Sequence, residues 1–223
     1  MRDSTKPSEN TLGEGESRPP RRPGRPTQAE TAALTELILN AAEDSFITRG
    51  FADTTIQQLS EDCGVTRRSI VARFKTTDAL LIAIYLRDVG AYSPSLAAYT
   101  IRESHLWEDL EALVRKLAER GADKRQAALL RAYLGEVVRL PELAQHILEF
   151  YRELSTIVEA KISVAQGFGL FRGFKASTVA ANAIALLISN ARIRTMILDP
   201  DFNDPVLVER YFTDAWLLIR AMA

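Results

Sequence analysis

Apolar residues recur at intervals of three and four along most of this sequence, and the first such run starts near residue 34. It is preceded by TQAE, residues 27–30, which has the Thr-x-x-Glu form of a capping box, and it is followed by Gly50. This pattern predicts a first helix that begins after Thr27 and ends at Gly50. The residues expected on its inner face are Leu34, Leu37, Ile38, Ala41, Ala42 and Phe46.

A second, shorter helix is predicted within TIQQLSEDCG, residues 55–64. We expect Thr54 to be its N-cap, with Gln57 three residues further on, and Ile56 and Leu59 to point inward. Glycine at the end of the run is the usual stop signal of a helix. The second helix should therefore end where the chain makes a tight turn.

The turn leads into a third helix, over residues 67–74, for which Thr66 is the predicted N-cap. Ile70 and Phe74 lie four residues apart and should anchor one face of it on the first two helices. Two short helices joined by a glycine-containing turn have helix-turn-helix spacing.

The rest of the chain reads as helix after helix, with no alternating strand pattern and no internal repeat. The predicted helices cover about residues 78–92, 104–120, 124–139, 141–166, 175–197 and 203–221, and turn signals such as YSPS, GFGLFRG and LDPDFNDP separate them. We therefore predict an all-α fold of about nine helices. Its expected parts are a disordered basic arm (1–26), a helix-turn-helix domain (27–77) and a helical C-terminal domain (78–223).

Composition narrows the class of protein. The chain has 223 residues, 47% of them hydrophobic, which is enough for a core, and one cysteine, Cys63, which excludes an internal disulfide. Cys63 is expected to be a small buried residue at the turn, and His105 and His146 to be surface or capping residues. No stretch approaches eighteen consecutive apolar residues, and GxSxG, P-loop and HExxH motifs are absent. We expect an intracellular protein that is not an enzyme, does not enter a membrane, and needs no metal or cofactor.

Charge is distributed unevenly along the chain. The segments 17–28 and 63–77 each contain four basic residues and no acid, whereas the remaining chain has 20 bases against 29 acids. Positive charge gathered in the N-terminal third, over an acidic remainder, predicts a polyanion partner for that third only.

The third helix carries side chains suited to that partner, because arginine can donate to phosphates and to guanine edges in the major groove. Hydroxyls at the starts of the second and third helices lie where the helix dipole favours a phosphate. In the arm, RRPGRP resembles a minor-groove AT-hook, and Arg25 would enter that groove. The predicted DNA-binding residues are Arg25, Thr55, Thr66, Arg67, Arg68, Ser69, Val71, Ala72, Arg73 and Lys75.

Residues 38–85 resemble the N-terminal domain of the TetR family of bacterial transcriptional regulators. The likeness lies in the first helix ending F-x-x-x-G-F, the TT that opens the second helix, the CGVT turn, and F-K-x-x-D-A-L leading into the fourth helix. The family commonly has glycine or alanine at Arg68, tyrosine at Val71, an aromatic residue or histidine at Arg73 and lysine at Thr77. The base preference of relatives is therefore not transferable.

The resemblance implies that the C-terminal helices form a homodimer and enclose a small-molecule pocket. It implies a cytoplasmic, nucleoid-associated repressor that leaves a palindromic, inverted-repeat operator on double-stranded DNA when an unknown small lipophilic ligand binds. For pocket walls we expect Trp107, Tyr133, Phe150, Leu154 and Asn182. For the dimer interface we expect Ala181, Ala185, Ile188, Val208, Phe212 and Trp216.

Two other functions are compatible with these patterns. One is an architectural DNA-binding protein that uses the C-terminal helices only for assembly and responds to no ligand. The other is a helical enzyme or small-molecule-binding protein whose basic segments only keep it soluble. Loss of DNA affinity with rising salt separates a DNA-binding protein from the latter.

Overall fold

The computed structural model describes residues 27–223, so the predicted arm and its Arg25 lie outside the described residues. Over that range the chain forms helices and no strand, which confirms the all-α prediction. The α8, η2 and α9 segments are one continuous helix with a π-helical middle, so the predicted nine helices are found close to their expected positions. The elements are α1 (Gln28–Thr48), α2 (Ile56–Cys63), α3 (Arg67–Phe74), α4 (Thr77–Ala97), η1 (Glu103–His105), α5 (Leu106–Ala122), α6 (Lys124–Glu136), α7 (Pro141–Gly167), α8 (Ala176–Ile184), η2 (Ala185–Asn190), α9 (Ala191–Met196), η3 (Pro200–Asn203) and α10 (Pro205–Arg220).

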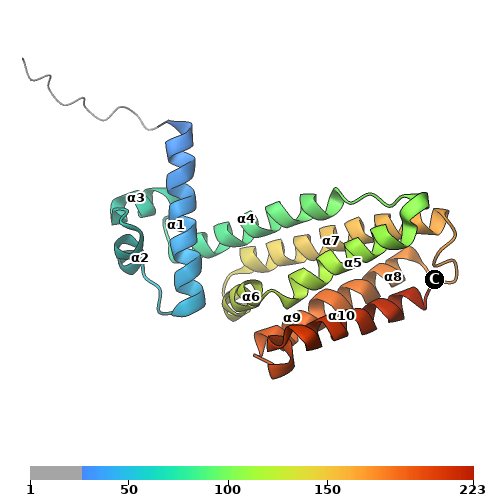
Figure 1. The fold of residues 1–223 in the computed structure, drawn as a ribbon. Helices are drawn as coiled ribbons and strands as arrows, with labels where there is room; N and C mark the ends of the chain where they lie inside the picture. The colour runs from blue at the N-terminus through green and yellow to red at the C-terminus, as the bar shows by residue number, and fades with distance from the viewer. Residues whose placement is uncertain (1–26) are drawn as a thin grey trace, which may run out of the picture.

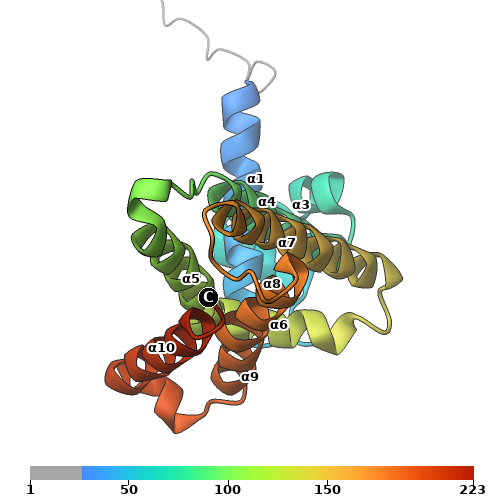
Figure 2. The ribbon, with the colours of Figure 1, turned by 90° about the vertical axis from the view of Figure 1, so that its right-hand side faces the viewer.

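The helices form two groups, which we call the head (α1 to α3, residues 27–76) and the body (α4 to α10, residues 77–223). In the head, α1, α2 and α3 lie together at one end of the molecule, and α4 runs from them into a bundle with α5, α7 and α8–α10 (Figure 1). Figure 2 looks along the body and shows α9 and α10 at one edge of it. A single cluster of buried apolar residues runs from Ile38 in α1 to Ile219 in α10.

Local capping accounts for where the head helices begin. Thr27 and Glu30 form the predicted capping box of α1: the Thr27 amide donates to the Glu30 carboxylate at 2.8 Å, and the Glu30 amide donates to the Thr27 hydroxyl at 3.1 Å. Leu37, expected on the inner face, is 47% exposed. The buried stripe of this helix runs through Ile38, Ala42 and Phe46, and Leu37 precedes it by one residue, a rotation of about 100°.

The predicted N-cap of α2 is wrong by one residue. Thr55 caps it, in a reciprocal pair with Gln58 rather than Gln57. Thr54 is buried instead, with its hydroxyl 2.8 Å from that of Ser45 and donating to the Gly50 carbonyl at 2.8 Å. The first of the two adjacent threonines therefore ties the turn to α1, and the second begins the helix.

A close helix crossing organises the body. A Cβ added at Gly121, near the end of α5, would lie 2.1 Å from the Leu187 carbonyl oxygen in η2. Glycine therefore lets the two backbones touch at this crossing. At the same place the Tyr211 hydroxyl of α10 donates to the Leu186 carbonyl, which the π-helical turn leaves accessible.

In the described part of the chain, one helical stretch, Ala176–Met196, is long and apolar enough to cross a bilayer by length and composition alone. Of its most apolar window, 44% is buried inside the bundle. That is the character of a central helix in an all-α domain as well as of a membrane span.

Candidate nucleic-acid interface and body cavity

The turn before α3 positions that helix. Gly64 ends α2 in the left-handed conformation, with φ of 66°, which glycine adopts without strain. The next residue, Val65, is buried, and Thr66 then caps α3 by accepting a hydrogen bond from the Ser69 amide. Ile70 is fully buried on the inner face, as predicted, and Phe74 is half-buried beside it. One face of α3 is therefore fixed against the rest of the head.

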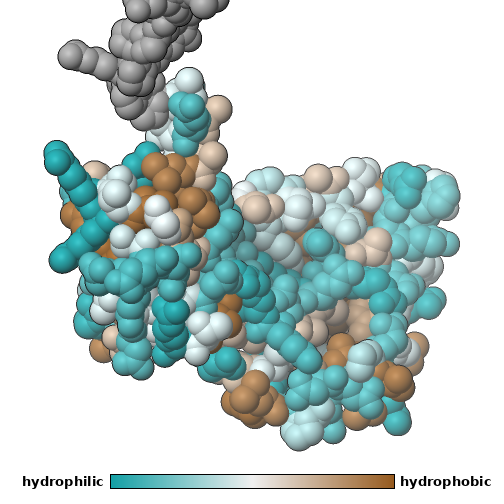
Figure 3. Space-filling view, turned by 60° about the vertical axis from the view of Figure 1, so that its left-hand side comes forward, coloured by the Kyte–Doolittle hydropathy of each residue, from teal (hydrophilic) through white to brown (hydrophobic). Residues whose placement is uncertain are grey.

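The opposite face of α3 is open to solvent. Arg67, Arg68, Ala72 and Lys75 are exposed, and Val71 is 40% exposed. The ion pairs within reach of the head, Arg49–Asp62 and those at its junction with the body, leave these bases out. In Figure 3, which brings this end of the molecule forward, hydrophilic side chains project freely from it. Within residues 27–223 no acid competes for the arginines of α3.

The remaining predicted contacts are placed less simply. The Thr55 hydroxyl donates to Gln58 at 2.8 Å, and the Thr66 and Ser69 hydroxyls lie 2.9 Å apart, so each already has a partner within its cap. The hydroxyls still mark the N-termini of α2 and α3, where free amides attract anions. Arg73 is half-buried, and its Nε is buried without a partner among the described residues.

The Arg49–Asp62 ion pair secures α2 to α1. Arg49 donates twice to the Asp62 carboxylate, at 2.7 and 3.1 Å, and these hydrogen bonds lower the pKa of Asp62. Asp62 lies at the end of α2, just before the turn into α3, but its charge is balanced by Arg49 at the end of α1. Cys63, expected to be buried, is half-buried, and its thiol donates to the Leu59 carbonyl.

This segment decides the family. Residues 38–84 match the sequence model of the family described as bacterial regulatory proteins, tetR family. Residues 38–84 are therefore a domain of the tetR family of bacterial regulatory proteins. The match runs from α1 into α4, includes the exposed face of α3, and supports a DNA-binding transcriptional regulator.

Solved TetR-family structures share the fold over most of this chain. A TetR regulator from Haloarcula marismortui is 18% identical, with a TM-score of 0.71 over 85% of this chain and 97% of its own. SmeT, the repressor of the Stenotrophomonas maltophilia multidrug efflux pump SmeDEF, is 23% identical, with a TM-score of 0.64 over 84% of this chain and 88% of its own. A SmeT–triclosan complex gives a TM-score of 0.66 at 23% identity, over 85% of this chain and 90% of that one. No curated relative matches the sequence.

Head and body meet at a cluster of ion pairs. Glu43 of α1 is 7% exposed and accepts from both Arg87 of α4 and Arg125 of α6. Arg125 also reaches Asp44 at 2.8 Å. Because one carboxylate holds two body helices to α1, we call Glu43, Arg87 and Arg125 the hinge cluster.

Two of the cavities in the body bear on the predicted ligand site. The larger, about 200 Å³, is mainly apolar and lies between α5, η2, α9 and α10, with Arg115, Leu187 and Phe212 among its walls. The smaller, about 20 Å³, has both charged and apolar walls and lies between α4, α5, α6, α7 and α9. Its walls are Tyr85, Asp88, Val89, Arg120, Gln126, Leu130, Tyr133, Ile147, Phe150, Tyr151 and Arg192.

Two of the five residues predicted as pocket walls, Tyr133 and Phe150, line the smaller cavity. Leu154 is buried in the core, and Trp107 packs edge-on against Trp216 with ring centroids 6.0 Å apart. Asn182 lies on the exposed side of α8, where its amide donates to the Thr178 carbonyl at 2.8 Å. Arg120 and Arg192 also line this cavity and are not among the predicted wall residues, because nothing in the local sequence signals that an arginine is buried.

The residues predicted for the dimer interface divide by exposure. Ala181 and Ala185 are exposed, whereas Ile188, Phe212 and Trp216 are buried inside the subunit and offer nothing to a second copy. Val208 is half-buried and lines the larger cavity. The large apolar side chains that these helices do expose are Ile193, Ile197, Leu198, Val206, Leu207, Leu217 and Leu218. We call this set, with Ala181 and Ala185, the outer face.

Proposed function

We propose that this protein is a repressor that binds an inverted-repeat operator as a homodimer and is released by a small molecule bound in the body, in the bacterial cytoplasm. The observation that carries the DNA-binding part is the exposed face of α3. Arg67 and Arg68 project from it without an acidic partner, and Ile70 fixes the opposite face. Guanidinium groups held in this way can donate to base edges and phosphates of a major groove.

The outer face supports dimerisation. A helix of eight residues covers only a few base pairs, so two copies related by a twofold axis are needed for useful affinity. Ile197, Val206 and Leu218 are between 58% and 73% exposed. They belong to α10 and to the end of α9, which lie at one edge of the body in Figure 2. Exposed apolar side chains that gather in one region are typical of an interaction surface. The small Ala181 and Ala185 allow a partner helix to approach closely.

Ligand release is supported by the cavities and by the hinge cluster. SmeT, which shares the fold, has been solved as a complex with triclosan. In this chain the smaller cavity and the hinge cluster use neighbouring residues of the same two helices, α4 and α6. A ligand would release DNA only if it binds more tightly to a form in which the two α3 helices are wrongly spaced.

Selection of bound duplexes from random DNA tests this proposal most broadly. We expect two copies of one short motif in opposite orientation, with centres about 34–36 Å apart or a multiple of that. A single unrepeated motif would contradict binding as a symmetric dimer. Recovery of no preferred sequence would contradict operator binding and favour an architectural role.

A further inference from the structure

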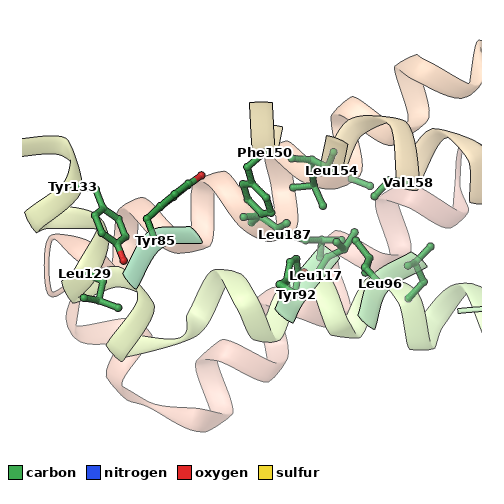
Figure 4. Close-up of a cluster of buried hydrophobic side chains, with 14 of the residues drawn as sticks. Tyr85, Tyr92, Leu96, Leu117, Leu129, Tyr133, Phe150, Leu154, Val158 and Leu187 are labelled. Carbon is green, nitrogen blue, oxygen red and sulfur yellow. The ribbon is translucent and has the colours of Figure 1, made fainter. Parts of the chain in front are cut away.

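The smaller cavity is lined by buried donors that have no acceptor. Arg192 is 7% exposed, and its Nε and Nη2 are buried without a partner among residues 27–223. The Nε of Arg120 and the hydroxyls of Tyr85 and Tyr133 are in the same condition. Figure 4 shows Tyr85 and Tyr133 together at one end of the buried cluster, near Phe150. Buried polar groups normally find a partner, so a wall with this many unused donors calls for an acceptor.

The charges of the cavity walls point the same way. Arg120 and Arg192 are both wall residues, and Asp88 is the one acid among those walls. Arg120 pairs with Asp88 through both guanidinium nitrogens of its fork, and Gln126 also donates to that carboxylate, at 2.9 Å. Arg192 is left as one positive charge in excess. Burial, and then the nearby charge of Arg120, lowers the pKa of Arg192, but a guanidinium remains protonated in a protein.

The tyrosines add two further hydroxyl groups without a partner. Burial raises the pKa of Tyr85 and of Tyr133, so both phenols keep their protons at neutral pH. A water molecule could accept from some of these donors, but it carries no charge to balance Arg192. An anion with two acceptor oxygens satisfies both requirements, and a carboxylate matches the planar guanidinium fork.

The π-helical turn explains how an arginine comes to lie inside the body. Along α8, η2 and α9, the buried residues Ala180, Ile184, Ile188 and Arg192 follow each other at intervals of four. In an α-helix each such step overshoots a full turn by about 40°, so the stripe would drift outward. The wider turn of η2 corrects the drift and brings Arg192 to the cavity.

From these contacts we infer that the cavity between α4, α5, α6, α7 and α9 binds a small organic monoanion, a carboxylate with an apolar remainder, held by Arg192 and Arg120. The inference rests on the proposed ligand-responsive function and names its ligand class, in place of an uncharged lipophile. The cavity of about 20 Å³ is little larger than one water molecule, so it takes only the carboxylate oxygens, and the walls must open for the rest of the ligand. The apolar remainder lies toward Leu130 and Ile147, which line the same cavity and are half-buried.

The same residues link this site to the hinge cluster. Asp88, the partner of Arg120, comes directly after Arg87 on α4, and Arg87 pairs with Glu43. On α6, Gln126 donates to Asp88, and its neighbour Arg125 holds Glu43. A carboxylate that draws Arg120 from Asp88 therefore alters the two helix segments that hold α1.

The test compares acids with their amides on the full chain. Octanoate, benzoate and phenylacetate are titrated at constant ionic strength against octanamide, benzamide and phenylacetamide, with thermal unfolding and calorimetric binding as readouts. We expect the acids to bind and to raise the melting temperature, and the amides to do neither. Equal effects of acids and amides, or no effect of any acid, would overturn the inference. Stabilisation by chloride alone, with nothing added by the acids, would overturn it as well.

Substitution of Arg192 locates the binding. R192M should keep or raise the melting temperature without ligand, because an unpaired buried charge is removed, and should bind the acids at least tenfold more weakly. The matched control is R115M in the larger cavity, where Arg115 is paired with Glu209 at 3.0 Å and which should bind them normally. Unchanged binding by R192M, or loss of binding by R115M alone, contradicts the assignment. The acid–amide comparison on the parent protein decides the inference even if R192M does not fold.

A measurement of operator affinity in the presence of each acid and amide distinguishes the two proposals. Acids that bind through Arg192 but leave affinity for the selected operator unchanged would sustain this inference and contradict ligand release. Amides that bind and release the operator would sustain ligand release and overturn the carboxylate.

Discussion

Two pairs of arginines in this protein stand in opposite surroundings. Arg67 and Arg68 extend into solvent from the head, where hydration stabilises their charge and leaves them available to a polyanion. Arg120 and Arg192 are buried in the body, where one aspartate balances only one of them. An unpaired guanidinium costs little free energy in water and several kcal/mol, roughly, in a core. The burial of an arginine therefore decides what kind of anion it binds.

Disruption of the dimer is expected to have the largest effect on the affinity of the head for DNA. L218E places a charge on the outer face, where Leu218 is 58% exposed. We expect a monomer by light scattering and a loss of operator affinity of about 10²–10⁴-fold, the gain that joining two binding modules supplies. V138E is the control, because Val138 is 92% exposed in the turn after α6 and should leave the dimer intact. A dimeric L218E would place the interface elsewhere.

Packing in the body is tested next by G121A. The new methyl group meets the backbone of η2, so we expect the free energy of unfolding to fall by about 1–3 kcal/mol in urea titrations. G90A is the matched control, because Gly90 of α4 has open space around it, and the better helix propensity of alanine should stabilise the protein by up to about 1 kcal/mol. Equal stability of G121A and the parent would contradict the close crossing.

The contrast between head and body was only partly readable in the sequence. Periodicity and turn signals predicted the helices, because the buried stripes and the breaker residues are local features. The N-cap of α2 was misplaced because two adjacent threonines satisfy the same signal, and only tertiary contact with Ser45 distinguishes Thr54 from Thr55.

Other features depend on contacts that the sequence does not contain. Phe212 and Trp216 were expected to face a second copy, yet they fill the subunit core, because α10 is apolar on more than one side. Arg192 is not among the predicted site residues, because an arginine in an apolar helix gives no sign of burial, and only the π-helical turn brings it inside. Its only sequence signal is its place four residues after Ile188.

The substitution E43Q is expected to have a smaller effect than L218E or G121A. It should weaken the coupling between ligand binding in the body and DNA binding by the head. The neutral amide cannot pair with Arg87 and Arg125 together, so we expect carboxylate binding to persist while its effect on operator affinity shrinks. Coupling energies of this kind are typically about 1–3 kcal/mol, and E43Q should remove most of it. E36Q is the control, because Glu36 also pairs with Arg87 but its side chain is 56% exposed. Full coupling in E43Q would exclude the hinge cluster as the connection.

The smallest expected effect is a pH dependence confined to the body. Hydrogen bonds from Arg102 to Asp109, at 2.6 and 2.9 Å, lower the pKa of Asp109 to about 2. An aspartate in the unfolded chain titrates near 4, so the contribution of this pair is complete above about pH 4 and is lost as the pH falls toward 2. In D109N, unfolding curves should lack that part of the pH dependence. Identical profiles for D109N and the parent would show that the pair does not contribute to stability.

The account depends most directly on the outward arginines of α3, and operator affinity as a function of salt measures their role. Fluorescence anisotropy of the selected duplex between 50 and 200 mM salt should show a steep loss of affinity for the parent and for R152A/R172A, an exposed pair on the body. R67A/R68A should bind at least about tenfold more weakly with a shallower salt slope, since each bidentate base contact contributes about 1–3 kcal/mol. If R67A/R68A instead follows the parent curve at every salt concentration, α3 is not the DNA-reading surface.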